Sequence, residues 1–288
     1  MMQGAEGKLY VQAGKVALWN VEVVGLDTIV AIPGGKVSIT EADVRAAAAI
    51  RESYLQDAVG MPRITLPRLT PEFTGDLNDF KGCEAIRFRK QDDAGVRCAA
   101  AWDDRNLYLG WDVQDSSPWT NSAGEPAQLY LGGDTVDFQL ATDPAADPKR
   151  AEAVAGDLRI SIGNLKGKAT AVIFRKVADP KKPMAFNSGV VKNYVMEYVD
   201  VIPATINVKI DPDRRYYIVQ AAIPLETLGL KSAQGLALRG DFGVTHGDPA
   251  GQRTRLRTFW SNQHTGIVDD AVFELQMEPR NWGELILK

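Results

Sequence analysis

The chain has 288 residues, of which 45% are hydrophobic and 24% charged, and its formal net charge is −4. This length is enough to bury a substantial core without disulfide or metal staples. A mildly acidic balance, without a run of Lys and Arg interleaved with aromatic residues, argues against nucleic acid as a partner, and no apolar stretch approaches the ~18 residues of a membrane span. The start, MMQGAEGKLYVQ, shows no export signal, so we expect a cytosolic protein, a mature product or a piece of a longer chain.

Residues 1–70 differ in pattern from the rest and are predicted to form a small N-terminal appendage. Hairpin-like material, KLYVQAGKVALWNVEVVG, precedes a helix that Thr40 can cap and that ends before Gly60 and Pro62. A stretch of this size buries little on its own. We therefore interpret it as a hairpin plus one helix, which could be the tail of a preceding module.

Residues 71–288 are predicted to be almost entirely β. Three alternating runs between residues 96 and 140 each place apolar side chains on one face, with Trp102, Trp111 and Phe138 among them. Further alternating runs follow, each bounded by Gly, Pro, Asp or Asn: DLRISIGN, ATAVIFRKV, VVKNYVMEYVDV, ATINVKID, RYYIVQAAIP, GDFGVTH, RTRLRTFW and AVFELQM. PLETLGL is a candidate one-turn helix with Pro224 at its first position. The pattern predicts an all-β protein, an antiparallel β-sandwich.

The two cysteines, Cys83 and Cys98, lie on the two arms of a predicted hairpin that turns at residues 92–95. Pairing about that turn leaves them several residues out of register, so we favour reduced thiols, with a disulfide as the alternative. Two cysteines and two distant histidines exclude a structural zinc cluster of the usual spacing.

Four motifs in order resemble family 9 carbohydrate-binding modules and their relatives in the DOMON-like superfamily. They are FTGDLNDFKG, AAWDDRNLYLGWDVQD, GGDTVDFQLATD, and VQAAIPLETLGL followed by GDFGV, and together they cover about residues 73–288. The resemblance implies a β-sandwich of jelly-roll type that binds a saccharide, often with paired aromatic side chains and structural calcium. It also implies an accessory module, secreted or periplasmic, joined to other modules of a longer parent chain.

An exposed Trp near planar polar groups is the pattern that sugar recognition needs. Trp102 and Trp111 are in phase with core residues, and Trp282 is expected to plug the last strand, whereas Trp119 lies in the irregular loop of residues 115–126, which is rich in Pro, Ser, Asn and Gly. Trp260 is either core or a second wall of a sugar slot. The predicted ligand-binding residues are Trp119, Asn121, Trp260, Arg257, Asn262 and Gln263.

Arg253, Arg255 and Arg257 alternate along one strand, so they are expected on one face. That face is either a solvated edge strand or a row of donors for sugar hydroxyls and nearby acids.

Eight acids against one base lie between Asp103 and Asp143. Calcium needs six to eight oxygen ligands, which acids and loop carbonyls can supply. The candidate metal ligands are Asp112, Asp115, Asp134 and Asp137, with ordinary turn and edge acids as the alternative, since no DxDxDG spacing is present. Paired carboxylates also make glycoside hydrolysis a candidate activity, but no other feature of the sequence supports it.

Because the DOMON-like superfamily includes haem-binding cytochrome domains, haem is a further candidate. The candidate axial ligands are His246, His264, Met184 and Met196, without a Cys-x-x-Cys-His attachment site. No signature ties a Ser or Cys nucleophile to either histidine. We therefore expect non-catalytic carbohydrate binding, with a haem-binding redox domain or a structural sandwich without a ligand as alternatives.

Overall fold

The computed structural model describes residues 3–5, 8–11, 29–31, 62–179, 181–263 and 267–288. The chain divides into two compact units, residues 1–60 and 61–288. In the first unit, β1 (Gln3–Ala5) pairs antiparallel with β2 (Lys8–Val11), which pairs parallel with β3 (Ile29–Ala31). The helix predicted after Thr40 lies outside the described residues.

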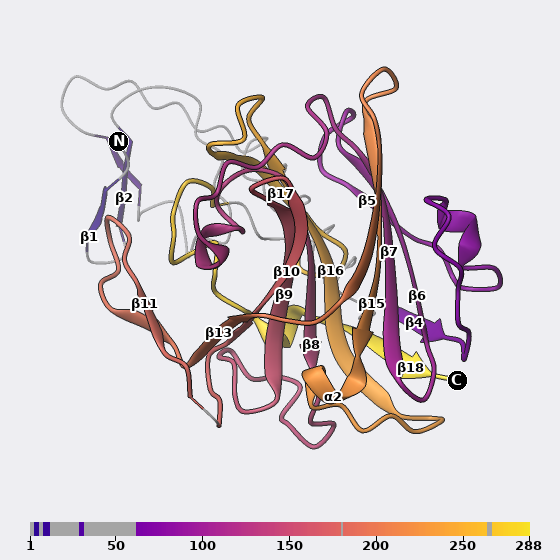
Figure 1. The fold of residues 1–288 in the computed structure, drawn as a ribbon. Coiled ribbons are helices and arrows are strands. Elements are labelled where there is room, and N and C mark those ends of the chain that lie inside the picture. Colours follow the sequence, from indigo (N-terminus) through magenta and orange to yellow (C-terminus); the bar gives the residue numbers. More distant parts are fainter. Residues whose placement is uncertain (1–2, 6–7, 12–28, 32–61, 180, 264–266) are drawn as a thin grey trace. The chain divides into compact units, whose positions relative to one another are not determined.

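Two sheets face each other in the second unit (Figure 1). The larger sheet has the order β13-β10-β9-β8-β16-β18-β4, with β17 also paired to β16. Its strands are β4 (Arg63–Leu66), β8 (Thr135–Ala141), β9 (Asp157–Leu165), β10 (Lys168–Arg175), β13 (Tyr198–Val201), β16 (Ala237–Gly247), β17 (Thr254–Phe259) and β18 (Gly283–Leu287).

The smaller sheet has the order β14-β15-β7-β6-β5, all antiparallel. Its strands are β5 (Ile86–Arg89), β6 (Gly95–Trp102), β7 (Asn106–Gln114), β14 (Thr205–Asp211) and β15 (Tyr216–Pro224). A separate hairpin joins β11 (Met184–Phe186) to β12 (Tyr194–Met196). The prediction of an all-β sandwich is confirmed.

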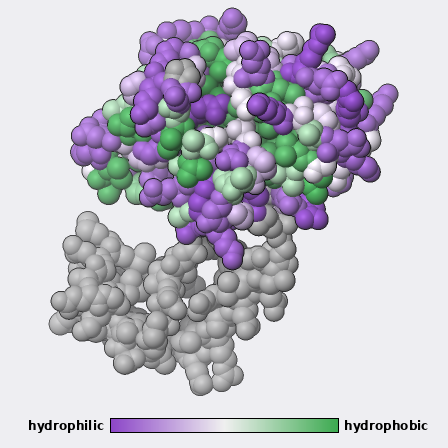
Figure 2. Space-filling view, turned by 90° about the horizontal axis from the view of Figure 1, so that it is seen from below, coloured by the Kyte–Doolittle hydropathy of each residue, from purple (hydrophilic) through white to green (hydrophobic). Residues whose placement is uncertain are grey.

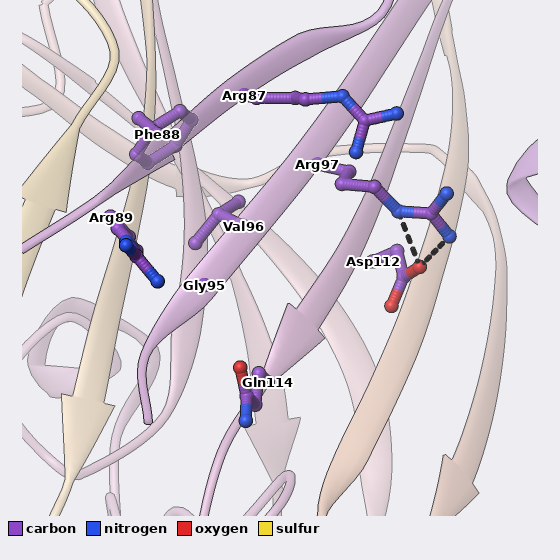
Figure 3. Close-up of a pocket in the computed structure, with 8 residues that line it drawn as sticks. All are labelled: Arg87, Phe88, Arg89, Gly95, Val96, Arg97, Asp112 and Gln114. Atoms are coloured by element: carbon purple, nitrogen blue, oxygen red, sulfur yellow. Dashed lines mark hydrogen bonds and ion pairs between the residues drawn. The ribbon is translucent and has the colours of Figure 1, made fainter. Parts of the chain in front are cut away.

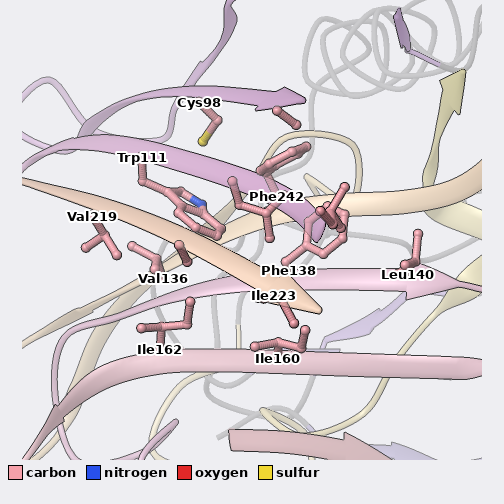
Figure 4. Packing of buried hydrophobic residues seen from close by; sticks show 14 of the residues in the cluster. Cys98, Trp111, Val136, Phe138, Leu140, Ile160, Ile162, Val219, Ile223 and Phe242 are labelled. Atoms are coloured by element: carbon pink, nitrogen blue, oxygen red, sulfur yellow. The ribbon is translucent and has the colours of Figure 1, made fainter. Parts of the chain in front are cut away.

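The main core lies between the two sheets. Phe242 is at its centre, with ring centroids 4.9 Å from Phe138 and 6.0 Å from Trp111, and residues of both sheets converge on it (Figure 4). Trp102 is also buried here. Burying a side chain of this size is worth about 1.5–3 kcal/mol, so the period-2 alternation that places these rings inward also fixes the strand register.

Short helices lie in the connections between strands. They are η2 (Leu77–Asp79), η3 (Pro126–Gln128), α2 (Leu225–Leu228) and η4 (Pro279–Asn281). Pro224 is the N-cap of α2 and not its first helical residue, and Gly229 ends the helix with φ 68°, a left-handed conformation that favours glycine.

One predicted strand is absent. AVFELQM forms turns instead of pairing in a sheet, with Val272, Leu275 and Met277 buried. Along β16, residues 237–240 pair with β18 and residues 243–247 with β17. β18 lies in the following GELIL and pairs parallel with β4.

Both cysteines are free thiols, as favoured from the sequence. Ile86 of β5 is the residue opposite Cys98, so Cys83 lies before the hairpin pairing begins. Burial raises the pKa of Cys83 to about 11, which makes this thiol a poor nucleophile at neutral pH.

Among the described residues, no helix is long and apolar enough to cross a membrane. Hydrophilic and hydrophobic residues are interspersed on the face of this unit that Figure 2 shows.

Candidate functional site

The outer face of the larger sheet carries buried polar side chains in place of the usual solvated ones. They come from alternate positions of four neighbouring strands: Asp137 and Gln139 of β8, Arg159 and Ser161 of β9, Thr245 of β16 and Arg257 of β17. Residues 123–131 and 271–282 pack over this face, with Leu129, Tyr130, Leu275 and Trp282 buried on it. The larger sheet is therefore covered on both sides.

Asp137 and Arg159 form the centre of this outer-face network. Arg159 Nε donates to Asp137 Oδ1 at 3.0 Å, and Ser161 donates to the same oxygen. The hydroxyls of Thr135 and Thr245 each lie 3.3 Å from Oδ2. The carboxylate is thus saturated with donors, as a buried charge requires.

Arg257 and Glu274 extend the network. Arg257 Nη2 donates to the Glu274 carbonyl at 2.8 Å, while Thr254 donates to the Glu274 carboxylate at 2.7 Å. Burial raises the pKa of Glu274, and burial together with the charge of Arg159 lowers the pKa of Arg257 to about 10. For both side chains, the loss of hydration on burial therefore shifts the pKa more than the attraction between Arg257 and Glu274 does. Arg257 Nε has no hydrogen-bond acceptor among the described residues.

A groove of about 610 Å³ opens beside this network, between residues 125–131 and the strands β11 and β13. Tyr130 is the buried ring of its lining, and Phe186 packs edge-on against it with centroids 6.2 Å apart. Lys182 and Asp200, whose charged atoms are 2.7 Å apart, also line it, together with Gln128. We call this the Tyr130 groove.

Tyr130 links the groove to the network. The guanidinium of Arg159 lies 5.4 Å from the centroid of its ring, and its hydroxyl donates to the Ala271 carbonyl. The Arg159 cation over the ring and the hydrogen bond of the Tyr130 hydroxyl therefore both fix the position of the Tyr130 side chain.

Trp119 is not an exposed wall, and the prediction that its ring lies outside the core is wrong. It is only 6% exposed and packs on Tyr217, with centroids 5.3 Å apart. The backbone at Trp119 has φ 62°, a left-handed conformation that turns the loop back over the sandwich. Trp260 is partly buried against a different ring, that of Phe242, at 6.3 Å.

Most of the other predicted ligand-binding residues form hydrogen bonds within the fold. Asn121 donates to the carbonyls of Leu129 and Asp134. The backbone N–H of Asn262 donates to buried Asp241 at 2.8 Å, and the Gln263 side chain donates to the Trp260 carbonyl at 3.4 Å. Of the six predicted residues, only Arg257 belongs to the outer-face network.

The four predicted metal ligands are divided among different partners. Asp112 pairs with Arg97, Asp115 lies 2.6 Å from His246 Nδ1, and Asp137 pairs with Arg159. Asp134 accepts from the amides of Thr120 and Gly247.

Burial and the charge of Asp115 raise the pKa of Asp134 to about 8. Burial also acts to raise the pKa of Asp115, but the hydrogen bond and the charge of His246 lower it by more, so the net shift is downward. No group of three or more His, Cys, Asp or Glu that could hold a metal ion is found among the described residues. Calcium binding stays a prediction, which melting curves with and without a chelator test.

The haem candidates are similarly scattered. His246 is buried beside Asp115, whereas Met184 and Met196 face each other across the β11–β12 hairpin. His264 lies outside the described residues. Haem binding also stays a prediction.

A family 9 carbohydrate-binding module from Caldicellulosiruptor kristjanssonii, solved in complex with cellotriose, matches the chain with a TM-score of 0.50. The match covers 79% of this chain and 94% of the module at 17% sequence identity. The chain has the fold of a family 9 carbohydrate-binding module. A family 9 structure from the same organism in complex with glucose gives a TM-score of 0.48 at 18% identity, covering 79% of this chain and 96% of that one. The sequence itself matches no protein-family model and no curated protein.

Within the family 9 fold, the sequence offered some signal for the residues that were missed. Arg159 stands between Leu158 and Ile160 in DLRISIGN, so alternation alone places it on the face opposite the core. Tyr130 and Phe186 lie outside the main alternating strands, and only the long-range packing of residues 123–131 and β11 brings them together.

Proposed function

We propose that residues 61–288 bind a saccharide without catalysis, and that the Tyr130 groove is the binding site. The observation that carries this proposal is the groove's mixed lining, in which the half-buried Phe186 ring and the charged pair of Lys182 and Asp200 border the same space. Its volume lies within the range of about 300–1,000 Å³ that is typical of small-molecule sites.

The lining suits a pyranose. Phe186 and Met184 supply apolar surface for the C–H faces, and Met184 is 41% exposed, so its side chain is accessible to a ligand. Lys182 offers donors, Asp200 offers acceptors, and Gln128 offers both, which matches the mixed character of sugar hydroxyls. The fold shared with the module that was solved with cellotriose supports the same ligand class.

Binding without chemistry fits the state of Asp200, the carboxylate of the charged pair in the groove. Asp200 is paired with Lys182, whose hydrogen bond is the main cause of the lowered pKa of Asp200. A general acid for glycoside hydrolysis needs the opposite, a raised pKa. As the resemblance implies, we further propose an accessory role in a secreted or periplasmic protein with additional modules.

Isothermal titration of the full chain with cellotriose and other neutral oligosaccharides tests the proposal. Phe186→Ala should weaken binding by about tenfold or more, since stacking surface and ordered contacts are lost. Val190→Ala is the matched control, because Val190 is 78% exposed on the loop of the same hairpin and is not part of the groove lining. A flat titration across the sugar panel, or equal affinity in the Phe186 variant, would refute the proposal.

A further inference from the structure

The outer face of the smaller sheet carries a row of residues that crosses all five strands. In register, Lys209 of β14 stands opposite Ile218 of β15, then Asp112 of β7, Arg97 of β6 and Arg87 of β5. The pleat places Phe88 and Val96, their chain neighbours, in the core. This row lies on the opposite side of the sandwich from the outer-face network of the larger sheet.

Two cations stand directly opposite each other in this row. Arg87 and Arg97 form a cross-strand pair and extend side by side in the same direction (Figure 3). Like charges in that arrangement destabilise a sheet. Asp112 neutralises only Arg97, to which it is hydrogen-bonded, and Arg87 has no ion-pair partner among the described residues. At Arg87, the outer face of the smaller sheet therefore carries a positive charge that no acid among the described residues neutralises.

A hollow of about 550 Å³ lies beside the pair. Gly95, which lacks a side chain, is part of its lining and stands opposite Arg89 of β5, and Gln114 of β7 lines the hollow as well. A Cβ added to Gly95 would meet Gln114 Oε1 at 3.2 Å, so any larger residue would begin to fill the space. Arg89 faces Asp92 at 3.5 Å, but both side chains are largely exposed, and such a pair contributes little.

We propose that this hollow, with Arg87 and Arg97, is a second binding site, and that its ligand is a carboxylate-bearing saccharide such as a uronic acid oligosaccharide. An arginine fork matches a carboxylate in bidentate geometry, and a ligand anion beside Arg87 removes the unbalanced charge. Gln114 and Asp112 supply partners for the neighbouring hydroxyls.

Nucleic acid fits this face less well. A polyanion of closely spaced phosphates would meet Asp112 within the hollow and a chain of net charge −4 around it. A single carboxylate per sugar unit, separated by neutral hydroxyls, matches one cationic pair bordered by polar groups.

The test is a titration of the full chain with tetragalacturonic acid, with its fully methyl-esterified form as the neutral counterpart. We expect the acid to bind, and the ester or Arg87→Gln to weaken binding about tenfold, the effect of losing one charge-assisted hydrogen bond. Arg63→Gln is the control for net charge, because Arg63 pairs with Glu284 on the larger sheet. Binding of the acid should also weaken at high salt.

Failure here is distinguishable from failure of the Tyr130 groove. Phe186→Ala should leave tetragalacturonate binding unchanged, and Arg87→Gln should leave binding of neutral oligosaccharides unchanged. Arg87→Gln should also hold or raise the melting temperature at low salt, since it removes the repulsion, so a loss of binding would not reflect unfolding. No binding of the acid, or equal binding by the ester or by Arg87→Gln, would overturn the proposal.

Discussion

Arg159 Nε and Nη2 both lie 3.0 Å from one carboxylate oxygen of Asp137, and neither side chain is exposed to solvent. Withdrawing two charges from water costs several kcal/mol per ion, and the attraction between them repays this only with good geometry and further hydrogen bonds. Ser161, Thr135 and Thr245 provide those bonds to Asp137. The pair therefore holds β8 and β9 in register and fixes the guanidinium behind Tyr130.

Asp137→Ala should lower the free energy of unfolding by about 3–5 kcal/mol, because it leaves the Arg159 charge buried and unpaired. Replacing both partners, with Asp137→Leu and Arg159→Met, should recover most of that loss. Urea denaturation of the two variants measures the difference. A double variant as unstable as the single one would mean that cavity and packing effects dominate, not the unpaired charge.

The strands could be predicted because their signal is local. Alternation placed Trp102, Trp111 and Phe138 inward, and all three are buried between the sheets. The predicted Arg row shows the limit of such reasoning. A register irregularity between His246 and Gly247 interrupts the pairing of β17, and Arg257 is buried beside Glu274. Arg255 instead faces Asp93 at 4.0 Å.

The site could be predicted less well, because its residues meet only through the packing of irregular segments. The loop composition around Trp119 suggested an exposed ring, but a positive φ and the distant Tyr217 place it in the core. Trp282 was expected to close off the end of the last strand. It is buried, but on the outer face of the larger sheet, where its indole donates to Gln139 at 2.8 Å.

Trp119→Ala should therefore act mainly on stability. We expect a loss of about 3–5 kcal/mol in the free energy of unfolding, as for other large-to-small changes in a core. Trp119→Phe should cost less and keep neutral-sugar affinity, because its ring still packs on Tyr217. Urea denaturation and calorimetric titration of each variant check this. A Trp119→Phe protein of near-normal stability that no longer binds sugar would instead make Trp119 a ligand contact.

Asp241 should make stability fall as the pH rises. Burial raises its pKa from 3.8 to about 7, despite the amides of Ser261 and Asn262 that donate to it and lower the pKa. The folded state thus keeps a proton that the unfolded state loses above about pH 4, and the stabilisation from that proton disappears as the pH passes through 7.

Asp241→Asn removes this titration. Relative to the unmodified protein, the variant should gain at least about 1 kcal/mol in the free energy of unfolding between about pH 5 and pH 8. Urea denaturation at several pH values measures the difference, and Asp213→Asn on the surface corrects for the change in net charge. A stability difference that stays constant across this range would show that Asp241 does not titrate there.

Gly133 should be required for the loop that forms one side of the Tyr130 groove. Its φ is 129°, and an added Cβ would lie 2.2 Å from the Thr120 carbonyl oxygen, a backbone atom that cannot rotate away. Gly133→Ala should therefore cost at least about 2 kcal/mol and displace residues 120–133.

Gly124→Ala is the matched control, because nothing lies within 4 Å of its added Cβ, and it should change stability by less than about 0.5 kcal/mol. Thermal unfolding measures both effects. Because Gln128, Tyr130 and Leu131 of the same loop line the groove, Gly133→Ala should also weaken neutral-sugar binding under conditions in which it stays folded, whereas Gly124→Ala should not. Unchanged affinity in a folded Gly133→Ala protein would place the sugar site away from this loop.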